Sequence, residues 1–99
     1  MRGNTLHEEF ESKNNAFDII RFWETAETLP DVKLNGQKIN ESIFLHLRFN
    51  VDGSLKNTFS HISKAFNLTY NQVYYQVERA LRHMRHPNRA KKYFDRKIT

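Results

Sequence analysis

Apolar residues recur at helical spacing in the second half of the chain. One set contains Phe59, Ile62 and Phe66, and a second set runs from Val73 to Met84. Asn67 separates the two sets, so the pattern predicts a short helix, a tight turn and a longer amphipathic helix. Thr69 can cap the longer helix with its hydroxyl group, and Gln72 can reach back to the N–H of that cap. The segment is therefore predicted to be a helix-turn-helix.

The first part of the chain carries aromatic and acidic residues at helical spacing. The pattern from Leu6 to about Thr28 predicts one helix, with a break near Asn14 and Asn15 as an alternative. Two interpretations of its apolar side chains stay open: they are core, or they form a docking surface for another protein. Packing is favoured, because aromatic residues at helical spacing usually pack. The side chains concerned are Phe17, Ile19, Ile20 and Trp23.

Leu29 and Pro30 end that helix, since the residue before a proline is pushed out of the α region. Asn35-Gly36 then lies between two short, partly apolar arms, which favours a β-hairpin near 32–39 or a simple turn. Asn40 can cap a further helix with Ile43 and Phe44 on its inner face.

A last helix is expected from Asn88 to about Lys97, with Tyr93 and Phe94 folded back onto the domain. These elements predict an all-α fold of four or five helices, with a short β-hairpin as the only candidate sheet. We divide the chain into an acidic, aromatic N-terminal segment, 1–39, and a helix-turn-helix domain, 40–99.

Composition limits the protein to one small domain, or one domain with an appended segment. The chain has 99 residues and no cysteine, which fits a reducing compartment, and no apolar run is long enough to cross a membrane. Charge is divided unevenly. Residues 1–52 hold six Lys/Arg and nine Asp/Glu, a net −3, whereas residues 53–99 hold ten and two, a net +8. A basic helix-turn-helix half is typical of a protein that binds the phosphate backbone, although a solvated basic surface is the alternative.

Catalytic and metal chemistry has little support in the sequence. We find no glycine-rich phosphate loop, no nucleophile signature and no carboxylate pair in an apolar setting. His83 and His86 stand three positions apart, but no further ligand follows at metal-binding spacing, so we interpret them as exposed histidines near DNA phosphates. We predict a protein that is not an enzyme and that has no cofactor, no metal and no small-molecule substrate.

Two stretches resemble the C-terminal domain, region 4, of bacterial primary sigma factors, the promoter-recognition subunits of RNA polymerase. Residues 80–89 read ALRHMRHPNR, close to the family's A-L-R-K-L-R-H-P-S-R, and residues 48–52 read RFNVD against the family's R-F-G-I-D. The resemblance covers residues 40 to 89. It implies a bacterial cytoplasmic protein whose partners are promoter DNA and RNA polymerase.

The recognition helix departs from that family. Sigma factors begin it with T-R-E-R-I-R-Q, whereas this chain has TYNQVYY at residues 69–75, so every arginine of that run is missing. Asparagine and glutamine favour adenine contacts, and arginines further along would contact the backbone. The candidate DNA-binding residues are Lys64, Thr69, Tyr70, Asn71, Gln72, Tyr74, Tyr75, Arg79, Arg82, Arg85 and Arg89.

In the resembled family, the helix that precedes the helix-turn-helix and the first helix of that motif form a groove that grips a flap of the polymerase β subunit. The matching apolar positions here are Phe44, Leu47, Phe59, Ile62 and Phe66. They are candidates for polymerase binding, although each alone could simply be core.

These observations predict a stand-alone, sigma-region-4-like transcription factor that associates with bacterial RNA polymerase and binds promoter DNA of altered sequence. Such short proteins are typical of phages or mobile elements. No counterpart of the sigma region that melts promoter DNA is present, so another protein would have to supply melting. The alternative is a polymerase- or sigma-binding adaptor or inhibitor that acts by protein contact, since three tyrosines suit a protein interface. A generic nucleoid-type DNA binder is third.

Overall fold

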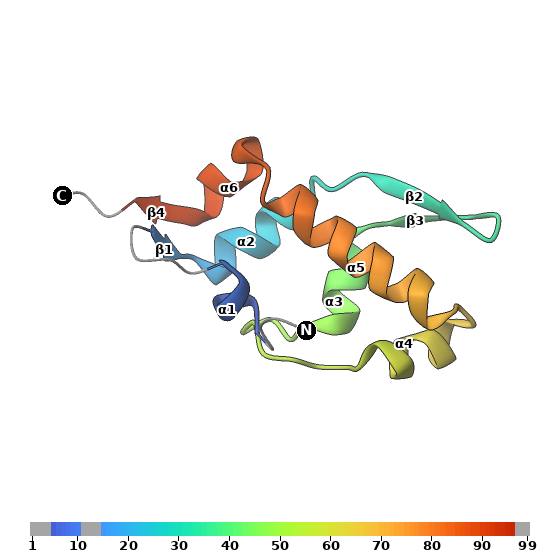
Figure 1. The fold of residues 1–99 in the computed structure, drawn as a ribbon. Coiled ribbons are helices and arrows are strands. Elements are labelled where there is room, and N and C mark those ends of the chain that lie inside the picture. Colours follow the sequence, from blue (N-terminus) through green and yellow to red (C-terminus); the bar gives the residue numbers. More distant parts are fainter. Residues whose placement is uncertain (1–4, 11–14, 97–99) are drawn as a thin grey trace.

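The fold was taken from a computed structural model, which describes residues 5–10 and 15–96 (Figure 1). The described elements follow one another along the chain as α1 (Leu6–Phe10), β1 (Asn15–Phe17), α2 (Ile19–Ala26), β2 (Asp31–Leu34), β3 (Gln37–Asn40), α3 (Ser42–Arg48), α4 (Phe59–Phe66), α5 (Tyr70–Met84), α6 (Pro87–Tyr93) and β4 (Phe94–Arg96).

The molecule is elongated, with principal extents of 48 × 23 × 18 Å. The 15-residue helix α5 runs through its middle (Figure 1). The β2–β3 hairpin and α4 lie toward one end of α5, and α6, β4, β1 and α1 lie toward the other. The two ends of α5 therefore have different neighbours.

The N-terminal segment differs from the predicted single helix. A three-residue strand, β1, separates α1 from α2, and it pairs antiparallel with β4, with Phe17 opposite Phe94. Asp18 then starts α2 by accepting a hydrogen bond from the N–H of Arg21. The prediction of one helix is therefore wrong, and Asn15, where a break was the alternative, opens a strand; Asn14 lies outside the described residues.

The chain end also differs from prediction. Helix α6 stops at Tyr93 because Phe94 takes up an extended conformation and enters β4, so the helix predicted to about Lys97 is too long. Lys97 itself is outside the described residues. Tyr93 folds back as predicted and is completely buried.

The hairpin prediction is confirmed. β2 and β3 pair antiparallel, with Leu34 opposite Gln37, and both turn residues have positive φ, 50° at Asn35 and 83° at Gly36. Positive φ at both central positions defines a type I′ turn. The described fold is thus mostly helical with the β2–β3 hairpin, as expected, whereas the second two-stranded sheet, β1–β4, was not predicted.

Buried residues from both predicted segments, 1–39 and 40–99, form one core. At the N-terminal side, Phe10, Phe17 and Phe22 surround Tyr93, with ring centroids 5.2 to 5.7 Å from the tyrosine ring. The Tyr93 hydroxyl donates a 2.6 Å hydrogen bond to the carbonyl oxygen of Met84. Burial raises the pKa of Tyr93 above its ordinary value. This aromatic cluster joins the chain's beginning to the end of α5.

The prediction that Phe17, Ile19, Ile20 and Trp23 pack into the core holds only in part. Phe17, Ile19 and Trp23 are half-buried and pack against the core, but Ile20 is 70% exposed. The apolar face of α2 points inward through Phe22 and Ala26, which lie four positions apart, and Ile20 falls outside that stripe.

Candidate nucleic-acid interface and partner groove

Helices α4 and α5 are joined by a three-residue turn whose ends are both fixed locally. Asn67 ends α4 in the left-handed conformation, with φ 54°. The Thr69 hydroxyl accepts a hydrogen bond from the N–H of Gln72 at 3.0 Å, and the Gln72 side chain accepts one from the N–H of Thr69 at 2.9 Å. The predicted capping box is therefore present, and it sets where α5 begins.

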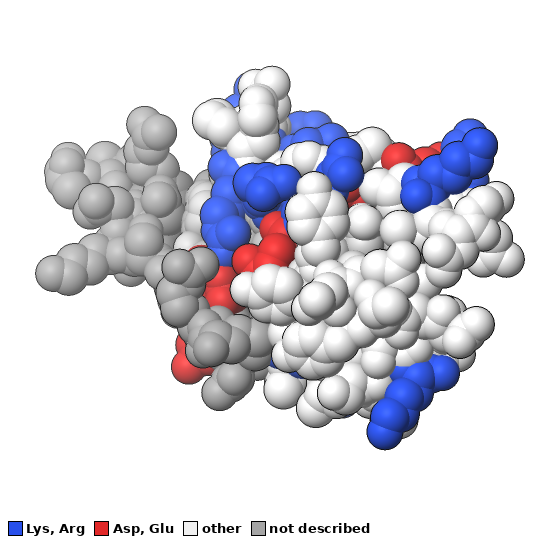
Figure 2. All heavy atoms as spheres, turned by 45° about the vertical axis from the view of Figure 1, so that its right-hand side comes forward, with Lys and Arg blue, Asp and Glu red and all other residues white. Residues whose placement is uncertain are grey.

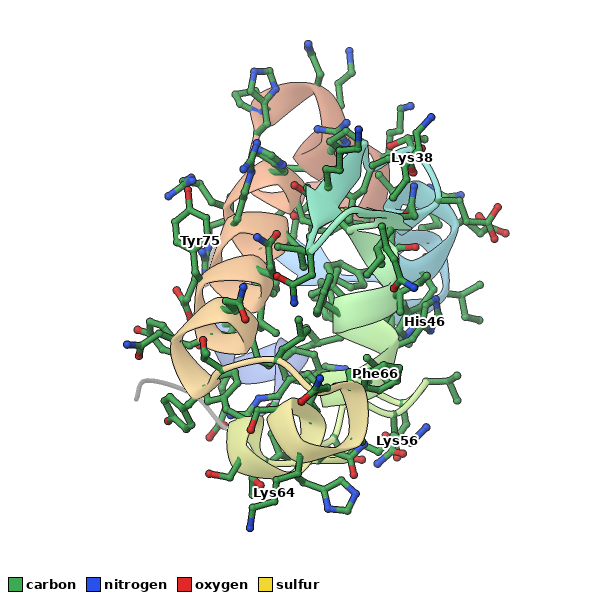
Figure 3. The ribbon with its side chains drawn as sticks, turned by 90° about the vertical axis from the view of Figure 1, so that its right-hand side faces the viewer. Lys38, His46, Lys56, Lys64, Phe66 and Tyr75 are labelled. Carbon is green, nitrogen blue, oxygen red and sulfur yellow. The ribbon has the colours of Figure 1, made fainter. Side chains whose placement is uncertain are left out.

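The outer side of α5 carries Asn71, Tyr75 and Arg82, which are all exposed. Their spacing of four and seven positions puts them on one face, opposite the buried Val73, Val77 and Ala80. Tyr75 is 52% exposed and points away from the domain (Figure 3). The structure thus brings these three predicted contacts together on one surface.

Tyr70 and Tyr74 lie beside that face, one turn apart on the shoulder toward α4. Both rings meet Phe59 edge-on, with centroid separations of 5.7 and 5.2 Å. They remain 49% and 43% exposed. Each tyrosine therefore has one edge packed on the domain and the rest of its ring open to a partner.

Arg48 packs against Phe59, the ring that Tyr70 and Tyr74 contact. Its guanidinium lies 3.9 Å from the centroid of the Phe59 ring and donates a 2.8 Å hydrogen bond to the carbonyl oxygen of Asn57. Burial lowers the pKa of Arg48, although an arginine remains charged at neutral pH. Arg48 belongs to the stretch that carries the family resemblance, but no local pattern around it predicts a place beneath the tyrosines.

Two basic residues in the C-terminal half of α5, Arg79 and His83, contact the protein itself. Glu41, which precedes α3, is completely buried, and its Oε1 lies 2.7 Å from Nδ1 of His83. Its Oε2 lies 3.3 Å from Nε of Arg79, an ion pair without hydrogen-bond geometry. His83 is therefore a partner of a buried carboxylate, and interpreting it as an exposed histidine was wrong. Asn40, the residue before Glu41, accepts a hydrogen bond from the N–H of Ser42, the first residue of α3.

Two more arginines reach the N-terminal segment. Arg85 forms an ion pair with Glu9, and its guanidinium lies 5.1 Å from the centroid of the Phe10 ring. Arg89 donates two hydrogen bonds to Thr28, at 3.0 Å to Oγ1 and 3.1 Å to the carbonyl oxygen. Figure 2 shows Lys and Arg gathered over one part of the surface with carboxylates directly beside them. Arg79, Arg85 and Arg89 thus already have protein partners.

Lys64 and Arg82 are the remaining basic candidates, and both side chains are exposed. Lys64 lies on α4 and points away from the domain in a different direction from Tyr75 (Figure 3). The structure therefore does not place all the predicted DNA contacts on one surface.

A groove of about 510 Å³ lies between the hairpin, α3 and the end of α4. Of the five residues predicted to bind polymerase, Phe44, Leu47 and Phe66 line it, although Phe44 is only 2% exposed and also belongs to the core. Phe59 and Ile62 do not line it; they belong to the core and are 5% and 1% exposed. The other lining residues are Leu34, Asn35, Gln37, Ile39, Ile43, Asn67 and Leu68.

Phe66 is the most accessible apolar residue of this groove, at 51% exposed, and it lies between α3 and α4 in Figure 3. In the same view, Lys38 on the hairpin and Lys64 on α4 lie on opposite sides of Phe66. Sequence reasoning missed the contribution of the hairpin. The alternation of Val32 and Leu34 with charged residues was the signal that one side of it is apolar.

Within the described part of the chain, no group of three or more His, Asp or Glu side chains could hold a metal ion. His86 caps α6 by accepting a hydrogen bond from the N–H of Asn88. None of the described helices has the length and apolar character needed to cross a membrane.

Comparison with known proteins finds one informative similarity. Over 62 residues, the chain is 37% identical to the RNA polymerase sigma factor SigA of Clostridium acetobutylicum, a match that covers 63% of this chain and 16% of that sigma factor. The chain therefore spans about a sixth of the length of the curated relative. No protein-family model and no solved structure matches. A stretch of 62 residues of this chain is thus similar in sequence to part of a bacterial sigma factor.

Proposed function

We propose that the chain is a sigma-region-4-like transcription factor that associates with bacterial RNA polymerase in the cytoplasm and binds promoter DNA through α4 and α5, acting as a helix-turn-helix. The observation that carries the proposal is the exposed outer face of α5, which carries Asn71 and Tyr75 near its capped start and Arg82 in its last turn. A helix presented in this way fits the major groove. The similarity to a sigma factor supports the same role.

Asn71 is the residue best suited to read a base. Its side chain is exposed, and asparagine can bond adenine through two atoms at once. Gln72 is less available, because its carbonyl oxygen already accepts the N–H of Thr69. Arg82 would contact phosphate, which positions a protein on DNA without reading its sequence.

A binding selection on random DNA tests this proposal, followed by affinity measurements at several salt concentrations. Specific binding should emerge, with the logarithm of the association constant falling linearly against that of the salt concentration, by about −0.9 per phosphate contacted. Asn71→Ala should broaden the selected sequence, whereas Arg82→Ala should weaken all sites alike and flatten the salt slope by about 1. A selection that yields no preferred sequence would sink specific DNA recognition.

We assign polymerase contact to the groove between the hairpin, α3 and α4. Its accessible residues, Ile43 and Phe66, are 43% and 51% exposed, so they could pack against a partner without any unfolding of this protein. Phe66→Asp should abolish co-purification with bacterial RNA polymerase. His61→Asp, an exposed change on the same helix outside the groove, should leave it intact.

The second candidate is an adaptor that acts by protein contact. It is favoured by the three half-exposed tyrosines and by the internal engagement of Arg79, Arg85 and Arg89, which leaves less positive charge for DNA. An adaptor should bind polymerase or a sigma factor at ordinary salt without protecting any DNA. Tyr74→Ala would then weaken protein binding, and Arg82→Ala would have little effect.

A further inference from the structure

A second hollow, of about 390 Å³, opens on the outer side of α2. Its lining comes from α2, α3 and the turn after α3, and it shares no residue with the groove that contains Phe66. The residues that line it are Ile20, Trp23, Glu24, Glu27, His46 and Val51. We call it the Trp23 hollow.

The floor of the Trp23 hollow is held in place from two sides. The indole N–H of Trp23 donates a 2.9 Å hydrogen bond to the carbonyl oxygen of Val51. The ring of His46 stacks on the indole, with centroids 4.4 Å apart and planes inclined by 19°. A fixed aromatic surface loses little conformational entropy when a partner covers it.

The rim exposes aliphatic side chains to water. Ile20 is 70% exposed and Val51 is 74% exposed, the highest values among the large apolar residues that the structure describes. Neither residue supports the core, so their exposure is not a by-product of packing. Exposed apolar side chains beside a hollow indicate an interaction surface.

Two carboxylates give the rim its charge. Glu24 and Glu27 are one turn apart on the ridge that also carries Trp23, and neither has an ion-pair partner among the described side chains. Arg21 on the same helix lies near Asp18 instead. This acidic spot stands out on a chain of net charge +5. It would repel DNA phosphates and attract a basic segment.

We propose that the Trp23 hollow is a docking site for a basic amphipathic segment of another protein. An aliphatic side chain of that segment packs between Ile20, Val51 and the indole, and a Lys or Arg one helical turn away pairs with Glu24 and Glu27. The site is separate from the DNA-facing side of α5, so it does not depend on the proposed function.

Trp23 is the only tryptophan of the chain, so its fluorescence reports directly on this site. The probe is a synthetic peptide in which leucine recurs at helical spacing and lysine fills the positions between, titrated into the full chain. The expected result is a saturable change in Trp23 emission. A peptide with the same lysines and with serine in place of leucine should produce none.

Variants locate the binding. We expect Ile20→Asp to lower the affinity for the peptide about tenfold or more, because burial of an aliphatic side chain is lost. The double variant Glu24→Lys with Glu27→Lys should lower the affinity by a similar factor, because charge attraction is lost. All three positions are exposed, and circular dichroism verifies that the variants fold. Glu78→Lys makes the same type of charge change on α5, and Phe66→Asp alters the other groove; both should leave the titration unchanged.

Three results would overturn the proposal. The first is no emission change with the leucine–lysine peptide. The second is a loss of affinity in Glu78→Lys that reaches about half, on a logarithmic scale, of the loss in the double variant, because one charge reversal against two would then mean attraction by net charge alone. The third is self-association of the chain without peptide, abolished by Ile20→Asp, which would show that a second copy covers the hollow.

Discussion

The polar side chains at the two ends of α5 differ in their surroundings. At the N-terminal end, Tyr70, Asn71 and Tyr75 are exposed, and the structure gives them few contacts beyond an edge of Phe59. At the C-terminal end, Arg79 and Arg85 contact carboxylates of the first half of the chain. The N-terminal end presents exposed side chains, whereas Arg79 and Arg85 connect the C-terminal part of α5 to the rest of the chain.

The difference shows that residue type alone does not give function. Arginines on a basic helix suggest phosphate contacts, but here carboxylates of the first half of the chain supply the opposing charges. Glu41 and Glu9 belong to the half with net charge −3, and their partners belong to the half with net charge +8. Part of this charge division therefore stabilises the fold.

The largest expected effect comes from breaking the aromatic cluster at the C-terminal end of α5. Phe22 is completely buried and contacts the rings of Phe10, Phe17 and Tyr93. Phe22→Ala removes a fully buried ring and leaves a cavity, so the free energy of unfolding should fall by about 4 kcal/mol. Urea denaturation followed by circular dichroism measures the change.

Phe66→Ala is the matched control, because it deletes the same side chain where half of it is already in water. Its cost should be about 1 kcal/mol, since much less apolar area is lost. Equal destabilisation by the two variants would mean that the aromatic cluster around Phe22 and Tyr93 does not anchor α5.

The second-largest expected effect distinguishes Arg79, which pairs with a buried carboxylate, from the exposed Arg82 on the same helix. Arg79→Met keeps the length of the side chain but removes the cation beside the buried carboxylate of Glu41. We expect a loss of about 2 kcal/mol, less than for a fully buried pair because Arg79 is 38% exposed and His83 remains. Arg82→Met, at an exposed position, should stay within about 0.5 kcal/mol of the native protein.

A double-mutant cycle sharpens this result. Adding Glu41→Gln to Arg79→Met replaces the buried charge with a neutral amide, so part of the lost stability should return. The opposite outcome is a double variant that loses more stability than the two single variants lose in sum. In that case the ion pair with Glu41 does not account for the stability that Arg79 contributes.

Local signals predicted much of the fold correctly. The break at Asn67, the capping box of Thr69 and Gln72, and the type I′ turn at Asn35-Gly36 all depend on residues within a few positions of one another. Such features are encoded in short stretches, and they can be found without knowledge of the tertiary structure.

Contacts between distant residues were not predictable in the same way. The β1–β4 pair joins the two ends of the chain, and three-residue strands carry almost no pattern of their own. Glu41 gave no sign that it would be buried, because its partners follow about forty positions later. The groove was anticipated on α3 and α4, but the contribution of the hairpin to it depends on how the hairpin folds back.

A smaller effect tests the link between α6 and α5. Tyr93→Phe removes the hydrogen bond to the Met84 carbonyl and should cost about 1 kcal/mol at neutral pH. Burial raises the pKa of Tyr93, so the folded protein retains that proton after the unfolded chain begins to lose it at about pH 10. Stability contributed by Tyr93 is therefore complete below that pH and declines above it.

Unfolding measured from neutral to alkaline pH checks this prediction. The native protein should lose stability more steeply than Tyr93→Phe above about pH 10, and the gap between them should narrow. A gap that stays constant over this range would contradict a buried, protonated tyrosine.

The smallest expected effect on stability lies at the N-terminal end of α5, and it separates folding from function. Tyr75 is 52% exposed and lies on the outer face of the helix, so Tyr75→Ala should change the free energy of unfolding by no more than about 0.5 kcal/mol. If this end of α5 contacts the partner, the same change should weaken binding to DNA or polymerase by about tenfold, as expected for a tyrosine in an interface. Thermal unfolding and binding, measured on the same preparation, distinguish the two properties. A variant that keeps full affinity for both partners would move the functional surface away from the outer face of α5, and only Tyr70 and Tyr74 on the Phe59 side would remain as candidates at this end.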